Sequence, residues 1–209
     1  MSKLKLLLIG AGGHARSCID VIEQEGKFQI SGLIGLDKEV GTFVNGYEVI
    51  GTDADLTKLA NKISYSLITV GQIASPELRI KLHEKTIGLG FTAVKISSPT
   101  AYISPTAQIG IGTIIMHGAI VNSKVKIGNN CIINSRTLLE HDTQVSDNCH
   151  ISTGAVLNGG VYVGEGCFIG SGSLVKECVS IGPHSVIGIG SVVRNNLENK
   201  SFVKGEFTK

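Results

Sequence analysis

The sequence feature with the clearest chemical potential is Glu140-His141-Asp142, three adjacent ionisable side chains. Histidine is the side chain best able to take up a proton at cellular pH, because its ordinary pKa lies near neutrality. A positioned general base of this kind accelerates a reaction by roughly 10²–10⁴. His141 is therefore a candidate general base, with an ordinary solvent-facing histidine as the alternative.

A second feature, Gly10-x-Gly12-x-x-Ala15, follows an apolar run and precedes a helical pattern that extends to about Glu25. A strand, a tight glycine turn and a helix N-terminus together form a phosphate-binding arrangement. A dinucleotide site usually has an acidic residue about 20 positions further on, whereas Asp37 lies 27 positions beyond Gly10. A mononucleotide diphosphate is thus favoured over NAD, and a purely structural turn is the third alternative.

The elements that must position these residues are clearest after residue 102. Reading from Ile103 in steps of six, every position through Val193 is Ile, Leu or Val. The residue four places after each is small or β-branched, except Leu197. A period of six belongs to neither a helix nor a strand and indicates a parallel β-helix with three flat sides. Its sixteen hexads predict about five coils.

The six-residue register also predicts where individual side chains lie. Glu140, His141 and Asp142 are neither the interior aliphatic nor the small corner residue, so at least some of them can project outward. Glycines that follow the aliphatic residue are expected at corners that need permissive backbone angles; they are Gly110, Gly128, Gly164, Gly170, Gly182 and Gly188. Three cysteines spaced by 18 residues, one coil each, should stack as small buried side chains; they are Cys131, Cys149 and Cys167.

Before the β-helix, strands alternate with helices, which indicates a small parallel-sheet α/β domain over residues 1–98. Strands are expected at 3–9, 30–34, 47–50 and 65–70. Helices are expected to begin at Asp53 as the N-cap, and at Pro76 with Ser75 as the N-cap.

Composition excludes several classes of protein. The chain has 209 residues, a formal net charge of +2 and no tryptophan, and it lacks a run of Lys or Arg, so a nucleic-acid interface is not expected. No apolar run approaches the roughly 18 residues of a membrane span. The first apolar run opens directly into glycines and reads as a strand, not a signal peptide. The cysteines have no metal-ligand spacing. A cytoplasmic protein without a metal is the expectation.

The whole pattern resembles the hexapeptide-repeat sugar O-/N-acetyltransferases, which modify nucleotide-linked 4-amino sugars and sialic acid. The motifs that carry the resemblance are Gly10-Ala11-Gly12-Gly13-His14, Val70-Gly71, and Leu139-Glu140-His141-Asp142 with His150. The resemblance implies a Rossmann-like βαβ domain (1–98) that binds the nucleotide sugar. A left-handed parallel β-helix (99–209) that carries the acetyltransferase site should follow. It also implies a homotrimer with active sites between subunits.

The resemblance further implies roles for the β-helix residues. His141 matches the general base, which would deprotonate the sugar's 4-amino group as it attacks the acetyl thioester. Asp142 would orient the imidazole and stabilise its cation. His150 matches the histidine that faces acetyl-coenzyme A in the neighbouring subunit, with a satisfied structural hydrogen bond as the alternative. Ser171 and Ile189 match positions along the pantetheine arm, and Asn134 matches an asparagine near the site.

The nucleotide end of the site is implied in the same way. Gly12, Gly13 and His14 would hold the nucleotide, with Gly71 and Gln72 at the next strand end. Family members often carry paired acids at the end of the second strand. Here the chain reads Ile34-Gly35-Leu36-Asp37, so that contact is shifted to Asp37 or lost. A usual C-terminal Gly-x-Pro-Ala segment is replaced by Gly205-Glu206-Phe207-Thr208, so part of the coenzyme A pocket is built differently.

The function that follows is acetyl-coenzyme A-dependent N-acetylation of the 4-amino group of a UDP- or dTDP-linked 4-amino-4,6-dideoxy sugar, for surface polysaccharide or glycan assembly. O-acetylation of sialic acid or another sugar hydroxyl is the nearest alternative. A non-catalytic trimeric β-helix scaffold is a second alternative, although a structural solenoid does not require Glu140, His141 and Asp142 together.

Overall fold

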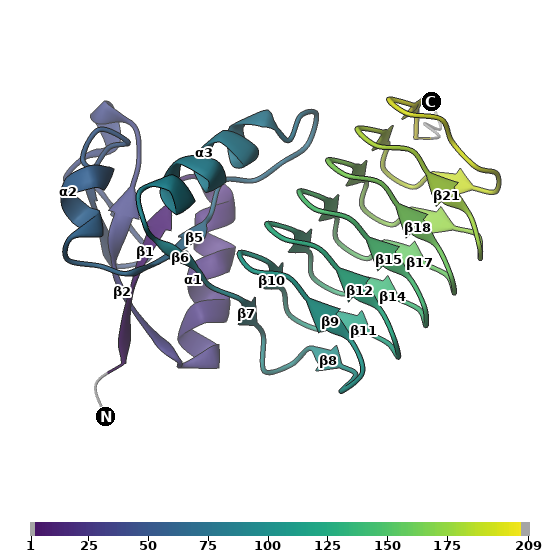
Figure 1. Cartoon of the computed structure of the whole chain (residues 1–209), viewed down its shortest axis with the longest axis horizontal. Helices are drawn as coiled ribbons and strands as arrows, with labels where there is room; N and C mark the ends of the chain where they lie inside the picture. The colour runs from purple at the N-terminus through teal and green to yellow at the C-terminus, as the bar shows by residue number, and fades with distance from the viewer. Residues whose placement is uncertain (1–2, 206–209) are drawn as a thin grey trace.

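The computed structural model describes residues 3–205, whose chain forms an α/β part followed by a long stack of coils (Figure 1). The α/β part holds one sheet in the order β3-β4-β2-β1-β5-β6, parallel except for the β3–β4 pair. Its strands are β1 (Leu4–Ile9), β2 (Phe28–Ile34), β3 (Phe43–Val44), β4 (Tyr47–Gly51), β5 (Tyr65–Ile68) and β6 (Thr92–Ala93). Its helical segments are α1 (Gly13–Glu25), a 3₁₀ turn (Asp37–Glu39), α2 (Leu56–Ala60) and α3 (Glu77–Gly88).

Strand β1 lies between β2 and β5 and is buried on both faces from Leu6 to Ile9. Its alternating side chains therefore supply two separate cores. Leu6 and Leu8 pack in a cluster with the buried face of α1, whereas Leu7 and Ile9 pack in a cluster with Leu56 of α2. A parallel sheet covered on both faces needs the near-continuous apolar run that this strand has.

The rest of the described chain is a three-sided parallel β-helix, as the period of six predicts. Every strand is two residues long and pairs in parallel with strands one coil away. One face is β7 (Ile96–Ser97), β10 (Ile114–Ile115), β13 (Ile132–Ile133), β16 (His150–Ile151), β19 (Phe168–Ile169), β22 (Val186–Ile187) and β24 (Phe202–Val203). The second is β8 (Tyr102–Ile103), β11 (Ile120–Val121), β14 (Leu138–Leu139), β17 (Val156–Leu157), β20 (Leu174–Val175) and β23 (Val192–Val193). The third is β9 (Gln108–Ile109), β12 (Lys126–Ile127), β15 (Gln144–Val145), β18 (Tyr162–Val163) and β21 (Ser180–Ile181).

The three faces, named here by their first strands, differ in what they present outward. The β7 face packs against the α/β part, since its Ile114 and Ile132 are fully buried in a cluster with α1. The β8 face presents an apolar column of six outward side chains, four of them markedly exposed; they are Tyr102, Ile120, Leu138, Val156, Leu174 and Val192. The β9 face presents mostly polar side chains; they are Gln108, Lys126, Gln144, Tyr162 and Ser180.

The interior confirms the predicted cysteine column. Cys131, Cys149 and Cys167 are all fully buried. Each thiol donates to a backbone carbonyl of the next coil, as with Cys149 Sγ and Gly164 O at 3.1 Å. Cys18 lies on α1 as expected, and Cys178 is the exposed cysteine of the five.

The predicted reason for the corner glycines is wrong. None of the six has a positive φ; an added Cβ would instead strike the next coil, as at Gly128, where it would lie 2.6 Å from the backbone nitrogen of Asp147. Close approach of backbones, not conformational freedom, requires glycine there. Positive φ occurs two positions later, at Gly112 and Asn130 among others.

Two predicted helix starts are also displaced. Helix α2 begins at Leu56 after Asp55, because the Asp55 carboxylate binds the backbone N–H of Thr52 and closes a turn before the helix. Helix α3 has Pro76 as its N-cap residue. Ser75 lies one residue earlier, and its Oγ accepts the N–H of Glu77 at 3.2 Å.

Candidate active site

The glycine turn forms an open helix N-terminus at the end of β1. Gly10 has φ +120°, and an added Cβ there would lie 2.6 Å from Cγ2 of Val70, so only glycine fits. Gly12 is the N-cap of α1, no side chain caps the helix, and its first turn has no acidic residue. Unpaired N–H groups and the positive end of the helix dipole make this turn suited to an anion.

A pocket of about 630 Å³ opens over this turn at the carboxyl ends of the parallel strands. Ligands of open α/β sheets bind at such strand ends. The predicted residues Gly12, Gly13, His14, Asp37 and Gly71 all line it. The lining also includes Glu39 and Leu78, which the sequence did not single out, and Asp53, which was expected only as a helix N-cap.

Gln72 and Asn134 do not line the pocket but lie at the junction of the α/β part and the β7 face. His150 is buried between them: its Nδ1 donates to the backbone carbonyl of Gln72 at 2.6 Å, and its Nε2 accepts from Nδ2 of Asn134 at 3.1 Å. Both ring nitrogens are thus used, which fixes one neutral tautomer. The Gln72 amide donates to the carbonyl of Cys167 at 3.3 Å.

The junction adjoins the pocket through His14, whose ring centroid is 6.5 Å from that of His150. Burial, with smaller contributions from Arg79 and His150, lowers the pKa of His14 to about 3. Burial likewise lowers the pKa of His150 to about 4, although its bond to Gln72 opposes the shift. Nε2 of His14 and Oε1 of Gln72 are buried without a hydrogen-bond partner among residues 3–205, so the junction retains unused polar atoms.

His141 lies elsewhere, at the corner between β14 and β15. Its Nδ1 lies 2.9 Å from Oδ2 of Asp142, and the two side chains are 65% and 55% exposed. Asp142 takes φ +60° as the second turn residue, a conformation that Asp tolerates better than most residues. Because Nδ1–H donates to the carboxylate, Nε2 is left free to accept a proton.

One residue that contacts His141 was not expected from the sequence. An added Cβ at Gly159 would lie 2.7 Å from both Cε1 and Nε2 of His141, so the imidazole rests directly on that glycine. Gly159-Gly160 lies one coil after His141-Asp142, and Gly160 N–H donates to the His141 carbonyl at 2.9 Å. The sequence signal that could have indicated this contact is the glycine pair 18 residues, or one coil, after the candidate base.

The predicted pantetheine positions form a third group. Ser171 and Ile189 lie at the corner between the β7 and β8 faces, where the N–H of Gly190 donates to the Ser171 carbonyl at 2.9 Å. Oγ of Ser171 is 2.9 Å from Oγ of Ser152, and Ile189 is 59% exposed. The two residues therefore stack one coil apart, as the register predicts. In the C-terminal segment expected at the coenzyme A pocket, Glu206, Phe207 and Thr208 lie outside the described residues.

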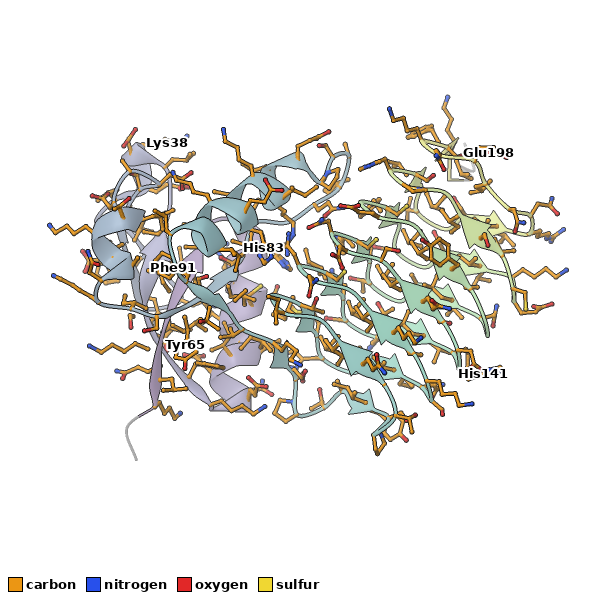
Figure 2. The ribbon with its side chains drawn as sticks, in the orientation of Figure 1. Lys38, Tyr65, His83, Phe91, His141 and Glu198 are labelled. Carbon is orange, nitrogen blue, oxygen red and sulfur yellow. The ribbon has the colours of Figure 1, made fainter. Side chains whose placement is uncertain are left out.

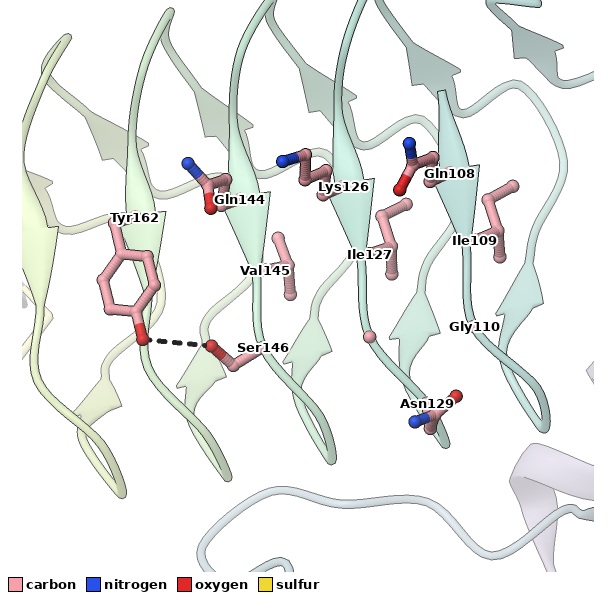
Figure 3. Close-up of a pocket in the computed structure, with 11 residues that line it drawn as sticks. Gln108, Ile109, Gly110, Lys126, Ile127, Asn129, Gln144, Val145, Ser146 and Tyr162 are labelled. Carbon is pink, nitrogen blue, oxygen red and sulfur yellow. Dashed lines mark hydrogen bonds between the residues drawn. The ribbon is translucent and has the colours of Figure 1, made fainter. Parts of the chain in front are cut away.

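Figure 2 shows that His141 lies at the side of the β-helix turned away from the α/β part. One chain therefore brings together the pocket over the glycine turn, His14, His150, Gln72 and Asn134, but not His141. A shallow groove of about 420 Å³ also runs along the β9 face (Figure 3), where Ser146 and Tyr162 hydrogen bond at 3.3 Å. The sequence did not indicate it.

Within residues 3–205, no helix is long and apolar enough to cross a membrane. No cluster of three or more His, Cys, Asp or Glu side chains with metal-binding geometry occurs in the same range.

Two family models match the chain. Residues 5–86 match the PglD N-terminal domain, and residues 106–141 and 142–177 match the bacterial transferase hexapeptide (six repeats). One curated relative, uncharacterized protein L142 of Acanthamoeba polyphaga mimivirus, is 33% identical over 112 residues. That match covers 54% of this chain but only 21% of the relative.

Solved structures match over nearly the whole chain. Perosamine N-acetyltransferase from Caulobacter crescentus, in complex with CoA and GDP-perosamine, is 31% identical with a TM-score of 0.88, covering 95% of this chain and 92% of that one. The acetyltransferase domain of PglB from Neisseria gonorrhoeae FA1090, in complex with acetyl coenzyme A, is 29% identical with a TM-score of 0.89, covering 98% and 97%. WeeI from Acinetobacter baumannii AYE, 23% identical with a TM-score of 0.85 over 97% of each chain, shares the fold.

These matches confirm the predicted fold class, a Rossmann-like βαβ domain followed by a left-handed parallel β-helix.

Proposed function

This chain belongs to the hexapeptide-repeat sugar acetyltransferases, and we propose that it transfers the acetyl group of acetyl-coenzyme A to the 4-amino group of a nucleotide-linked 4-amino-4,6-dideoxy sugar. Residues 1–98 would bind the nucleotide sugar, and residues 99–209 would carry out acetyl transfer. Both substrates are cytoplasmic metabolites, so we place the enzyme in the cytoplasm.

The observation that carries this proposal is the pairing of His141 with Asp142 on the floor made by Gly159. The carboxylate holds Nδ1–H at 2.9 Å, and Nε2 has no hydrogen-bond partner within residues 3–205 on a side chain that is largely exposed, so an amine can reach it. The perosamine N-acetyltransferase, structures of which also exist with one histidine replaced by asparagine or alanine, holds CoA and a nucleotide-linked amino sugar. That likeness supports the same substrate classes here.

In the proposed reaction, the neutral 4-amino nitrogen attacks the carbonyl carbon of the acetyl thioester. A carbon–nitrogen bond forms and the carbon–sulfur bond breaks. Nε2 of His141 accepts the proton that the nitrogen loses, and Asp142 stabilises the resulting imidazolium. That proton then passes to the departing sulfur, so coenzyme A leaves as the thiol and His141 returns to its neutral state.

The nucleotide would occupy the pocket over the glycine turn. Its diphosphate would bind the N–H groups of Gly12, Gly13 and His14 at the start of α1, as anions do at open helix N-termini. Asp37 lines the same pocket and would accept a hydrogen bond from the ribose or base. The sugar would then point toward His14 and the junction, where Gln72 and Asn134 can contribute polar atoms.

The active site would be completed by a second copy of the chain. His141 lies on the side of the β-helix away from the pocket (Figure 2), so another subunit must bring its own His141 to it. The apolar column of the β8 face supports such an assembly, because exposed apolar stretches of this extent are typical of interfaces. We propose a homotrimer, whose cyclic symmetry would give three equivalent sites. His150, Ser171 and Ile189 would line the acetyl-coenzyme A side.

The assembly is tested with Leu174→Lys, which puts a charge into the apolar column, and Ser180→Lys as the matched control on the polar β9 face. Light scattering during gel filtration should give a trimer for the wild type and the control, and a smaller species with little activity for Leu174→Lys. Equal masses for all three proteins would contradict an interface on the β8 face.

The reaction is tested by following thiol release from acetyl-coenzyme A with UDP-, dTDP- and GDP-linked 4-amino sugars. Turnover with one of these sugars, and N-acetylation of the product by mass spectrometry, would support the proposal. Turnover only with sialic acid or another hydroxyl acceptor would replace it with O-acetylation. No turnover with any acceptor would favour the scaffold.

A further inference from the structure

The proposed nucleotide pocket has an electrostatic peculiarity. A nucleoside diphosphate sugar carries about two negative charges on its diphosphate, yet no lysine or arginine is among the described residues that line the pocket. The charged side chains in the lining are instead acidic: Asp37, Glu39 and Asp53. A positive charge that does not touch the ligand would add to the attraction of the backbone N–H groups at the glycine turn.

Arg79 lies behind the pocket, on the first turn of α3, and is 1% exposed. Its Nη1 donates to the carbonyls of Ile68 and Val70, at the end of β5, and Val70 lines the pocket. Its Nη2 donates to the carbonyl of Asn130 at 3.2 Å and to Oδ1 of the same residue at 2.8 Å. The guanidinium thus joins the pocket wall to a corner of the β-helix.

The charge on Arg79 has no local counter-ion. No carboxylate lies within 4.0 Å of the guanidinium among residues 3–205, and its Nε is buried without a partner. The carboxylate that the hydrogen-bond chain reaches is Glu165, two amides away: Asn130 Nδ2 donates to Asn148 Oδ1 at 2.8 Å, and Asn148 Nδ2 donates to Glu165 Oε1 at 3.0 Å. Burying a cation without a nearby anion lowers the stability of the fold. We therefore expect the Arg79 charge to have a functional role.

The field of Arg79 extends to the pocket. After burial, the charge of Arg79 is the largest cause of the lowered pKa of His14, which lines the pocket. Burial lowers the pKa of Arg79 itself only to about 10, so the guanidinium stays protonated at neutral pH. The positive end of α1 opens into the same pocket, so an anion bound at the glycine turn would interact favourably with the helix dipole and with the guanidinium.

We propose that Arg79 is a positioning residue that attracts the substrate's diphosphate through its buried, uncompensated charge, and is not a structural arginine alone. Resting on the proposed function, this inference explains how an acidic-walled pocket accepts a dianion. A diphosphate would be the counter-ion that the described chain does not supply.

The test introduces a negative charge next to the Arg79 guanidinium. Asn130→Asp puts a carboxylate where Oδ1 already lies 2.8 Å from Nη2 of Arg79, and Asp tolerates the φ of +53° at this position. Asn196→Asp is the matched control: it adds the same charge at the far end of the β-helix and keeps the oxygen that accepts the N–H of Ser180. Calorimetric titration would measure the Kd of UDP, dTDP and GDP, and of the corresponding uncharged nucleosides.

Asn130→Asp should weaken nucleoside diphosphate binding by about tenfold and leave nucleoside binding unchanged. The control should match the wild type. Equal diphosphate affinity in Asn130→Asp and wild type would overturn the role of Arg79 while leaving the proposed function intact. A wild type that binds none of the nucleoside diphosphates would overturn both.

A second variant covers the possibility that Asn130→Asp does not fold. Arg79→Gln removes the charge but keeps an amide that can donate to a carbonyl. It should weaken the diphosphates selectively and flatten the dependence of their Kd on salt concentration. Equal losses for diphosphate and nucleoside would mean that Arg79 only supports the pocket wall, and would overturn the proposal.

Discussion

His141 and His150 lie nine residues apart in the β-helix. The two histidines have very different surroundings. His141 stands at an outer corner, 65% exposed, with a carboxylate on Nδ1 and nothing on Nε2. His150 lies in a strand of the face that packs on the α/β part, with neutral partners on both nitrogens. The first arrangement leaves a ring nitrogen open to a substrate, whereas burial in the second lowers the pKa of His150 to about 4.

The position within the six-residue unit decides between these outcomes. A turn residue projects away from all three sheets, whereas an outward strand residue meets whatever covers its face. On the β7 face that cover is the α/β part, which buries His150 beside His14. A corner of this β-helix can therefore present an accessible imidazole, and a covered strand can hold an imidazole in fixed hydrogen bonds, with the same backbone supporting both.

The largest expected effect comes from removing the proposed base at the exposed corner. His141→Asn should lower kcat by at least about 10², because an asparagine amide cannot act as a general base. Steady-state thiol release measures the change. His184→Asn is the control, since it replaces a histidine at another corner where φ is +57° and asparagine is well tolerated. Unchanged kcat in His141→Asn would remove His141 from the mechanism.

The next effect concerns the carboxylate that distinguishes His141 from His150. Asp142→Asn keeps the backbone conformation but replaces a charged acceptor by a neutral one. Losing the carboxylate that orients the imidazole should lower kcat by about 10- to 100-fold, because the ring is no longer held in place. Steady-state thiol release measures the change. An unchanged kcat in Asp142→Asn would mean that Asp142 only shapes the turn.

A smaller effect is expected at the floor of the same corner. Gly159→Ala adds a methyl group 2.7 Å from two ring atoms of His141, so the imidazole must rotate away. We expect kcat to fall by about tenfold with little change in melting temperature. Gly88→Ala is the control, since no atom lies within 4 Å of its added Cβ. A Gly159→Ala enzyme with full activity would show that the ring position is not important.

The last effect is on stability and not on catalysis, and it should appear at the buried junction. His14 and His150 have pKa values of about 3 and about 4 in the folded chain against 6.5 otherwise. Both are neutral in either state above pH 6.5, so their contribution to stability is complete there. Below it the unfolded chain binds more protons, and unfolding free energy should fall by about 1.4 kcal/mol per pH unit for each histidine.

Urea unfolding at pH 7.5 and pH 5 measures this loss. His150→Asn should show a shallower decline than the wild type, and His184→Asn should not. An equal decline in all three proteins would show that His150 does not drive the acid sensitivity.

Much of the architecture was predictable because the β-helix requires the same residue types at a fixed period in the sequence. Each coil contributes an aliphatic residue every six positions, so the register from Ile103 onward specified the interior and the stacked cysteines. The strand–glycine–helix motif predicted the open turn under the pocket in the same local way. The roles of the glycines at 110 and 128 were misjudged, because the contact that requires them comes from the next coil and leaves no mark in the neighbouring sequence.

The arrangement of the site was less accessible. Burial of His150 depends on α1 and on Gln72, which are distant in sequence and meet it only through the docking of the α/β part. Arg79 reads as an ordinary polar helix residue, and nothing near it in sequence shows that Asn130 accepts its hydrogen bonds. Such long-range polar contacts depend on how two domains pack, which no short period encodes.

The distribution of the cysteines makes the enzyme convenient to label. Four thiols are sealed inside, and the exposed fifth, Cys178, lies in the same corner column as His141, with its sulfur 3.3 Å from an added Cβ at Gly160. A maleimide dye should therefore attach at one site per chain without mutagenesis. A fluorophore fixed there would stand two coils from the proposed base, close enough to report through its emission when substrates or a second subunit arrive.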